Sequence, residues 1–231
     1  MNTFIFEAQS TSWFKTDLPT YHCRFDKSLY KDELFAQLGI YFPESLINAV
    51  AKRRAEFLAG RYCAAEALRQ LNIHNFIIKT GANRNPLWPE TVKGSISHCD
   101  NYAIAIASDK SDLIGVGIDI ESQITEETFE KIQSQVLSVS EIELISNIDL
   151  KKTISFAVAF SLKESFFKAS YPTIQKYFDF SAVTITDIDS VGNTVSFKVN
   201  ETLHESFKKG MLLQGEFHLL PEEKVVTLVK I

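Results

Sequence analysis

The 231-residue chain is 45% hydrophobic and carries a formal net charge of −5, which is the composition of a folded protein of acidic character. The hydrophobic content excludes a largely disordered chain, and the acidic balance argues against a general nucleic-acid binder, which normally has a basic excess. The length allows one large domain or two of about 110 residues each.

The three cysteines, Cys23, Cys63 and Cys99, are widely spaced, and the chain has no CxxC pair. This usage disfavours a zinc site or a disulfide framework and suits a reducing compartment. The first ten residues lack the basic start of a signal peptide, and no apolar run approaches the ~20 residues of a membrane span. We therefore expect a cytoplasmic protein without a membrane span.

Short apolar alternations at 3–6 and 21–25 predict strands near the N-terminus. From Pro43 the apolar residues recur at helical spacing, which predicts a helix over 43–71 with room for one break. A solvated face is the usual role of basic residues on such a helix, and a phosphate clamp is the functional alternative. The small residues around Arg61 favour the clamp. The basic residues of this helix are Lys52, Arg53, Arg54 and Arg61.

An irregular segment at 74–94, rich in Gly, Asn and Pro, follows the helix. Arg84 lies in its middle, where loop residues often carry function, although an ordinary surface arginine also fits. In the next stretch, Gly94-Ser-Ile-Ser-His-Cys99, the hydroxyl of Ser97 and the imidazole of His98 cluster after a glycine. That cluster suits phosphate oxygens, and the alternative is a histidine that makes only a structural hydrogen bond.

The segment Gly115-Val-Gly-Ile-Asp-Ile-Glu121 predicts a strand with Asp119 and Glu121 on one face. Two acids on one face repel each other unless a cation or a basic group lies between them. Oxygen ligands at this spacing suit a hard cation such as Mg²⁺, and a solvated acidic turn is the alternative. We also expect residues 95–120 to form a hairpin that brings His98 within reach of Asp119.

Polar turns predict helices within 122–150, where Ser140 and Glu143 have the spacing of a capping box. From residue 180 onward the chain turns to strands, with a hairpin turn signal at 189–193. Each half of the chain therefore offers a long helix and a few strands, which leaves an ancient duplication open. The predicted C-terminal strands are 183–186, 194–199, 212–219 and 224–229.

A long and mostly buried helix is predicted over 153–169, where Glu164 and Lys168 share a face at i,i+4. A surface salt bridge is one interpretation of this pair. The turns before Glu164 are too apolar for a well-solvated helix, however, and a buried acid needs a partner. A metal shared with Asp119 and Glu121 would supply that partner.

Two of these motifs, taken together and in this order, resemble the paired signature of the 4′-phosphopantetheinyl transferases. They are Gly117-Ile-Asp-Ile-Glu121 and Phe160-Ser-Leu-Lys-Glu-Ser-Phe-Phe-Lys-Ala169. Three upstream blocks, at 52–61, 84–89 and 94–99, look like those of the bacterial siderophore-synthase branch of this family. The resemblance runs from about residue 50 to residue 170.

The resemblance implies that the protein moves the 4′-phosphopantetheine arm of coenzyme A, its co-substrate, onto a serine of an apo carrier protein and releases 3′,5′-ADP. Family members use Mg²⁺ or Mn²⁺. Their carriers serve non-ribosomal peptide, polyketide or fatty acid synthases. The branch favours a peptidyl or aryl carrier of siderophore or other secondary metabolism and leaves acyl carriers open.

The double-length family members are monomers of two similar α+β halves related by a pseudo-twofold, with coenzyme A in the cleft between them. In each half a long helix packs on a small, mostly antiparallel sheet. We therefore expect an α+β fold and a monomer. The N-terminal half, 1–114, would hold the basic helix and coenzyme A contacts, and the C-terminal half, 115–231, would hold the acids and the catalytic helix.

The resemblance also implies roles for individual residues. The carrier serine needs a base for this reaction, and Glu164, directly or through a metal-bound water, is the candidate; Lys168, one turn further on, would stabilise charge on the phosphates. The metal ligands match Asp119, Glu121 and Glu164. The contacts to coenzyme A match Arg53, Arg61, Arg84, Ser97, His98, Asp119 and Lys168.

Two other functions stay open on the sequence. A non-catalytic coenzyme A or nucleotide-binding module would use Arg84 and His98 but would need no acid triad. A Mg²⁺-dependent phosphohydrolase would use the acids with an in-line water. The presence of all three acids together with Lys168 argues against the binding module.

Overall fold

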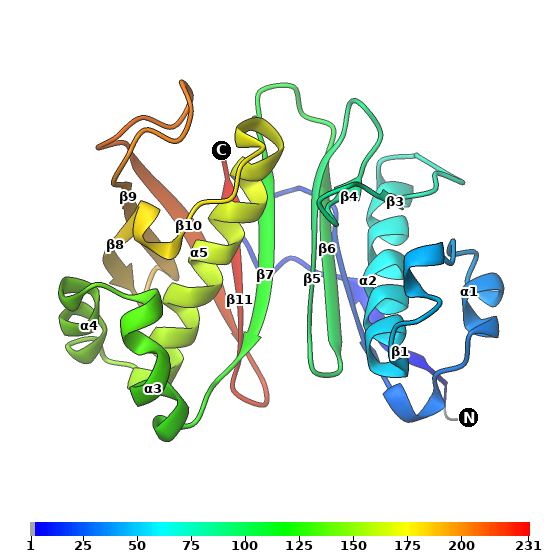
Figure 1. The fold of residues 1–231 in the computed structure, drawn as a ribbon, viewed down its shortest axis with the longest axis horizontal. Helices are drawn as coiled ribbons and strands as arrows, with labels where there is room; N and C mark the ends of the chain where they lie inside the picture. The colour runs from blue at the N-terminus through cyan, green and yellow to red at the C-terminus, as the bar shows by residue number, and fades with distance from the viewer. Residues whose placement is uncertain (1–2) are drawn as a thin grey trace. The chain divides into compact units, whose positions relative to one another are not determined.

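The computed structural model describes residues 3–231 and divides the chain into two compact units, Met1–Val116 and Gly117–Ile231. In each unit a long helix packs on a largely antiparallel sheet (Figure 1), which confirms the predicted α+β class. Within residues 3–231, no helix has both the length and the apolar character needed to cross a membrane.

The first unit holds a four-stranded sheet in the order β1-β2-β6-β5 and a separate two-stranded ribbon of β3 and β4, all with antiparallel pairing. Its strands are β1 (Ile5–Ser10), β2 (Thr20–Phe25), β3 (Lys79–Thr80), β4 (Pro86–Leu87), β5 (Lys93–Cys99) and β6 (Tyr102–Ser108). Its helical segments are η1 (Lys27–Leu29), α1 (Glu33–Gln37), η2 (Glu44–Leu46) and α2 (Ala51–Gln70).

The helix predicted over 43–71 is broken into η2 and α2, and Arg54 stabilises the break. Its Nε donates to the carbonyl oxygen of Ala49 at 3.0 Å, and its Nη2 donates to that of Ile47 at 2.6 Å. These carbonyls lie just before α2 and have no helical donor, so the arginine satisfies them. Arg54 is therefore a structural member of the basic run.

The helix α2 packs on β2, β5 and β6 through a face of small and aliphatic side chains. Ala55, Ala59 and Ala64 on this face have no exposed surface. Small residues let the helix axis approach the sheet closely. A Cβ on Gly60 would lie only 2.9 Å from Cγ2 of Ile96 on β5, which shows how close that approach is.

The second unit holds a five-stranded sheet in the order β7-β11-β10-β9-β8. The four strands predicted after residue 180 are confirmed, and so is the β8–β9 hairpin. In the turn of this hairpin, Asp189 Oδ1 accepts hydrogen bonds from the amides of Val191 and Gly192, both at 2.9 Å. The elements are β7 (Val116–Ser122), α3 (Glu126–Val136), α4 (Val139–Ser146), α5 (Lys152–Ile174), η3 (Phe180–Ala182), β8 (Val183–Asp189), β9 (Thr194–Val199), β10 (Leu212–Leu220) and β11 (Lys224–Lys230).

The sheet order shows that the hairpin expected over 95–120 is wrong. The strand β5 pairs with β6, and His98 lies opposite Ala103. The strand that carries Asp119, β7, neighbours β11 in the sheet of the second unit. An alternating or apolar run identifies a strand but does not specify its partner, so proximity in sequence was a poor guide to pairing.

The predicted capping box is present two residues earlier, at Ser138 and Glu141 instead of Ser140 and Glu143. Both pairs have the same spacing, but only Glu141 is buried. Its Oε1 lies 2.8 Å from Nζ of Lys163, and both side chains are almost fully excluded from solvent. The local sequence allows α4 to begin after either serine. The buried contact of Glu141 with Lys163 selects the start after Ser138.

The strand β7 passes very close to α5 at Gly117. A Cβ at this position would lie 1.9 Å from the carbonyl oxygen of Ser165 and 2.7 Å from the amide nitrogen of Ala169. Only glycine permits this approach of the two backbones. The contact holds Asp119, two residues further along β7, against the turn of α5 that carries the predicted catalytic residues.

We predict that Gly117→Ala lowers the free energy of unfolding by about 3 kcal/mol, because its methyl group would overlap backbone atoms that cannot move independently. Urea denaturation followed by circular dichroism measures the change. Gly60→Ala is the matched control: its nearest neighbour is a side-chain methyl, and alanine favours the helix interior by about 1 kcal/mol. Equal losses of stability in the two variants would contradict the role given to Gly117.

Candidate functional site

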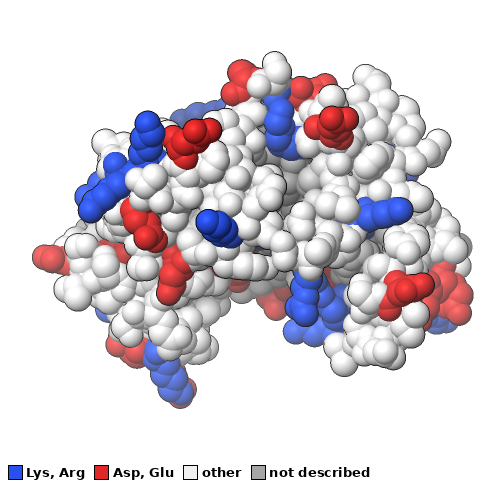
Figure 2. All heavy atoms as spheres, turned by 45° about the horizontal axis from the view of Figure 1, so that its top comes forward, with Lys and Arg blue, Asp and Glu red and all other residues white. Residues whose placement is uncertain are grey.

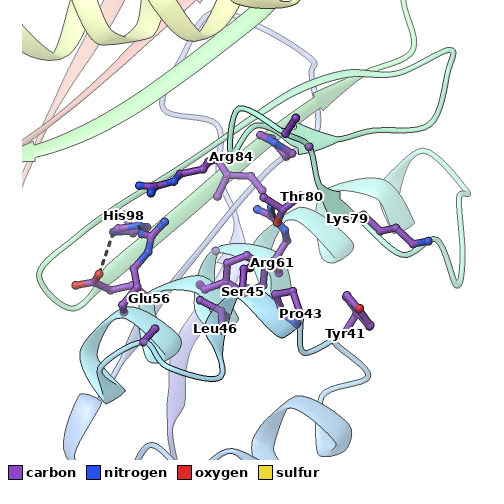
Figure 3. A pocket seen from close by; sticks show the side chains of 18 residues that line it. Tyr41, Pro43, Ser45, Leu46, Glu56, Arg61, Lys79, Thr80, Arg84 and His98 are labelled. Atoms are coloured by element: carbon purple, nitrogen blue, oxygen red, sulfur yellow. Dashed lines mark hydrogen bonds and ion pairs between the residues drawn. The ribbon is translucent and has the colours of Figure 1, made fainter.

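A cavity of about 720 Å³ lies in the first unit, lined by η2, α2, β5 and the segment around β3 and β4. Its lining includes Arg53 and Arg61 from α2, Arg84 from the loop before β4, and His98 from β5. Figure 3 shows the side chains of Arg84 and His98 extending toward the same end of the cavity. The fold thus gathers basic side chains from three distant parts of the sequence.

Arg61 is a buried cation in this cavity, with only 8% of its surface exposed. Its Nε donates to the carbonyl oxygen of Ile78 at 3.1 Å, its Nη2 donates to Thr80 Oγ1 at 3.3 Å, and its guanidinium lies over the ring of Phe57. Burial, with a smaller contribution from the charge of Arg53, lowers the pKa of Arg61 to about 10, so it stays charged at neutral pH. Its hydrogen-bond partners are neutral, which suits a site for an anion.

His98 lies between two charged residues of α2. Nη1 of Arg53 is 3.0 Å from His98 Nε2, and Oε2 of Glu56 is 3.9 Å from His98 Nδ1. Arginine can only donate, so Nε2 is the acceptor and the ring proton resides on Nδ1, on the side of Glu56. Glu56 is 8% exposed and also lies 3.3 Å from Lys27 Nζ.

Glu56 is a site residue that was not predicted from the sequence. The signal was an acid on the helix face that also carries buried alanines, three residues after Arg53. Residues three apart on a helix are neighbours on its surface, so Glu56 had to lie beside any anion held by Arg53. A buried acid beside a proposed anion site requires an explanation, which the contacts with Lys27 and His98 provide.

Arg84 adopts a left-handed backbone conformation with φ of 64°. Non-glycine residues in this region store about 1 kcal/mol or more of strain. The turn is held by hydrogen bonds from the amide of Arg84 to the carbonyl of Gly81 at 3.0 Å and from the amide of Gly81 to the carbonyl of Asn85 at 2.8 Å. The strained turn lies at the cavity wall and projects the arginine over it.

Ser97 does not line the cavity with His98. Along β5 the side chains of Ile96 and His98 line it, whereas Ser95 and Ser97 are buried on the other face of the strand. The cluster proposed from sequence treated neighbouring residues as one group, although successive side chains of a strand point to opposite faces. A contact of Ser97 with coenzyme A stays a prediction.

A second cluster lies in the second unit and joins β7 to α5. Oδ1 of Asp119 accepts a hydrogen bond from Nζ of Lys168 at 2.6 Å, and Asp119 is only 3% exposed. Burial raises the pKa of Glu164 above its usual value; the charge of Asp119 adds to the rise, and that of Lys168 opposes it. The three predicted residues therefore lie close enough to influence one another, as the sequence indicated for Glu164 and Lys168.

The donor chemistry of this cluster fits a hard cation. Asp119, Glu121 and Glu164 offer carboxylate oxygens, and a cation would relieve the repulsion between the first and the last of them. Lys168 provides the positive charge beside Asp119 in this arrangement. Across residues 3–231, no three His, Cys, Asp or Glu side chains are grouped so that they could hold a metal ion, so the metal site stays a prediction.

A smaller cavity of about 250 Å³ adjoins Glu164. Phe167 stacks with Tyr177 at 5.6 Å between ring centroids and meets Phe178 edge-on at 5.2 Å. An acid whose pKa is raised by burial thus borders an aromatic slot. The residues around it are Lys163, Glu164, Phe167, Tyr177, Phe178, Asp179, Phe180 and Val183.

Basic and acidic side chains are interspersed on the face of the molecule shown in Figure 2. The basic lining of the larger cavity is therefore a local concentration of positive charge in a chain whose net charge is −5. Local positive charge of this kind suits a small polyanion.

Comparison with known proteins places both units in one family. Residues 42–108 match the family model of the 4′-phosphopantetheinyl transferase N-terminal domain. Residues 115–227 match the model of the 4′-phosphopantetheinyl transferase superfamily. The first match covers α2 and β5, and the second covers Asp119, Glu164 and Lys168.

Three curated relatives agree with these matches. Enterobactin synthase component D of Escherichia coli (strain K12) is 38% identical over 125 residues, which are 54% of this chain and 58% of that protein. The 4′-phosphopantetheinyl transferase PptT of Mycobacterium tuberculosis is 32% identical over 162 residues, 66% of each chain. The 4′-phosphopantetheinyl transferase Npt of Nocardia iowensis is 31% identical over 141 residues, 61% of this chain and 62% of that one.

The alignment with the Escherichia coli relative thus spans little more than half of that protein's length. The two family models nevertheless cover most of the present chain and include both sequence motifs that carried the resemblance. This chain belongs to the 4′-phosphopantetheinyl transferase superfamily.

Proposed function

We propose that this protein is an enzyme that transfers the 4′-phosphopantetheine arm of coenzyme A to a serine of an apo carrier protein and releases 3′,5′-ADP. The observation that carries the proposal is the pairing, in one chain of this superfamily, of a cavity lined by cations with a cluster of the buried Asp119, the partly buried Glu164 and Lys168. The cavity would bind phosphates, and the cluster of acids and lysine would supply a base and a counter-charge.

The larger cavity would bind the phosphates of coenzyme A. Arg61 presents a charged guanidinium on a rigid helix, and Arg84 reaches over the cavity from its strained turn. Arg53 and His98 stand at the same wall. Guanidinium groups match phosphate geometry, and a cavity of about 720 Å³ falls within the size range of small-molecule sites. The 3′-phosphate is the group that we place at Arg84 and His98.

The reaction requires the serine hydroxyl oxygen to attack the phosphorus that bears the pantetheine arm. The new Ser O–P bond forms as the bond from that phosphorus to the bridging oxygen of the pyrophosphate breaks, and that oxygen leaves with 3′,5′-ADP. Glu164 accepts the serine proton, and its raised pKa makes its carboxylate a stronger base for this step. Lys168 stabilises the charge that develops on the phosphate oxygens.

A Mg²⁺ or Mn²⁺ ion held by Asp119, Glu121 and Glu164 would neutralise charge on the pyrophosphate. Asp119 also orients the ammonium group of Lys168 through their 2.6 Å contact. The aromatic slot beside Glu164 offers apolar walls for the pantetheine arm. These residues thus bind, orient and accept a proton within one small region of the second unit.

The carrier protein that we propose belongs to siderophore or related secondary metabolism. Support comes from the relatives named enterobactin synthase component D. We further propose that the protein acts as a monomer in the cytoplasm, since a double-length chain already contains both family domains.

The decisive experiment is the intact mass of apo carrier proteins of the peptidyl, aryl and acyl types after incubation with this protein, coenzyme A and Mg²⁺. A mass gain of one phosphopantetheine, lost in Asp119→Ala, supports the transferase. Binding of coenzyme A without any gain points to a binding module. Release of phosphate or hydrolysis of coenzyme A without a carrier adduct points to a phosphohydrolase.

We predict that Glu164→Gln lowers the turnover number at least 100-fold while the dissociation constant of coenzyme A changes less than about threefold, because the amide keeps the shape but cannot accept the serine proton. Steady-state kinetics with a carrier protein and calorimetric titration of coenzyme A measure the two quantities. An unchanged turnover number would remove Glu164 from the mechanism.

We predict that Arg84→Gln raises the dissociation constant of coenzyme A about tenfold but that of dephospho-coenzyme A less than about twofold, since only the former carries the 3′-phosphate. Lys52→Met is the control, because Lys52 is exposed on α2 and does not line the cavity. Equal weakening of both ligands by Arg84→Gln would place the 3′-phosphate elsewhere.

A further inference from the structure

Four ionisable side chains form a row at the wall of the larger cavity. Lys27 Nζ lies 3.3 Å from Glu56 Oε1, Glu56 Oε2 lies 3.9 Å from His98 Nδ1, and His98 Nε2 lies 3.0 Å from Arg53 Nη1. Figure 3 shows Glu56 directed at the imidazole, with the pair marked by a dashed line. The row connects the partly exposed Lys27 of η1 to three residues that line the cavity, Glu56, His98 and Arg53.

Among the described residues that line this cavity, Glu56 is the one carboxylate. Its side chain is 11% exposed, whereas that of Lys27 is 30% exposed. Burial of an ionised carboxylate requires compensating positive charge. Lys27 supplies part of it from η1, and a protonated His98 would supply more.

The hydrogen bonds of His98 indicate how an anion would change the surroundings of its ring. Without a ligand, Nε2 accepts a hydrogen bond from Arg53, so the imidazole is neutral with its proton on the Glu56 side. A phosphate would draw the guanidinium of Arg53 toward itself. The lone pair of Nε2 would then face negative oxygens, and a proton on Nε2 turns that repulsion into a charge-assisted hydrogen bond.

We propose that Glu56 is a positioning residue that stabilises the imidazolium form of His98, so that binding of coenzyme A takes up a proton at this histidine. The inference rests on the proposed function, which makes coenzyme A the ligand of the cavity. Glu56 lies on the Nδ1 side of the ring, 3.9 Å away, and balances its new charge. Protonation is opposed by Arg53, Arg61 and Arg84 on the cavity wall until the anion neutralises them.

Calorimetric titration of coenzyme A into the full-length protein tests the proposal. The experiment is repeated at pH 7.5 in buffers of different ionisation enthalpy, and the slope of the observed enthalpy gives the protons taken up on binding. Phosphate groups also exchange protons near neutral pH. The uptake measured with His98→Asn is therefore subtracted, and a positive difference is expected for the wild-type protein.

Two variants should move this linkage in opposite directions. Glu56→Gln keeps the shape but removes the charge, so the pH above which affinity falls should decrease by roughly half a unit. Lys27→Met removes a cation that competes with His98 for Glu56. The pH above which the affinity for coenzyme A falls should therefore increase by a similar amount. Glu66→Gln is the matched control, since Glu66 lies on α2, pairs with Arg69 and does not line the cavity.

A structural role alone would weaken binding equally at every pH in Glu56→Gln, and that result overturns the proposal. Identical proton uptake by wild type and Glu56→Gln overturns it as well. If Glu56→Gln fails to fold, Lys27→Met becomes the deciding variant. The proposal expects it to raise the pH above which affinity falls, and an unchanged pH overturns the proposal. Proton-linked binding without phosphopantetheine transfer supports this inference while the proposed function fails, and no binding of coenzyme A overturns both.

Discussion

The close approach of β7 to α5 at Gly117 is the constraint on which the second unit depends. With no Cβ at this position, the strand backbone rests directly on the helix near Ser165 and Ala169. Asp119 is thereby held beside Lys168, from a part of the sequence almost fifty residues away. A larger residue would separate strand and helix, and the buried acid would lose the cation that compensates it.

The buried pair of Lys163 and Glu141 secures the same turn of α5 from its other side. Nζ of Lys163 also donates to the carbonyl oxygens of Val136 at 2.9 Å and Phe180 at 3.2 Å, so all three of its donors are used inside the protein. Lys163 and Glu164 are adjacent in sequence but have different roles. Both border the smaller cavity, but Lys163 uses its three donors inside the protein and is structural, whereas Glu164 is a carboxylic acid whose pKa is raised by burial.

The two clusters are electrostatically distinct, and each fits one part of the proposed reaction. The cavity of the first unit has several cations and a single acid, an arrangement that binds polyanions. The cluster of the second unit pairs the buried Asp119 and the partly buried Glu164 with one lysine, an arrangement that suits proton acceptance and a bound cation. Among the described residues of the cavity lining, Glu56 is the acid, and the 3.9 Å between its Oε2 and Nδ1 of His98 would let it balance the charge of a protonated histidine.

The sequence by itself determined the long helices, the C-terminal strands and the acid motif, because helical periodicity, turn residues and short motifs are local properties. It did not determine that β7 leaves the β5–β6 sheet, that Ser138 rather than Ser140 caps α4, that Ser97 turns away from His98, or that Glu56 lies behind that histidine. Strand partners and buried ion pairs depend on contacts between residues far apart in the chain. Only the tertiary structure decides which strands pair and which ions are buried together, because these contacts become favourable only when both partners leave water together.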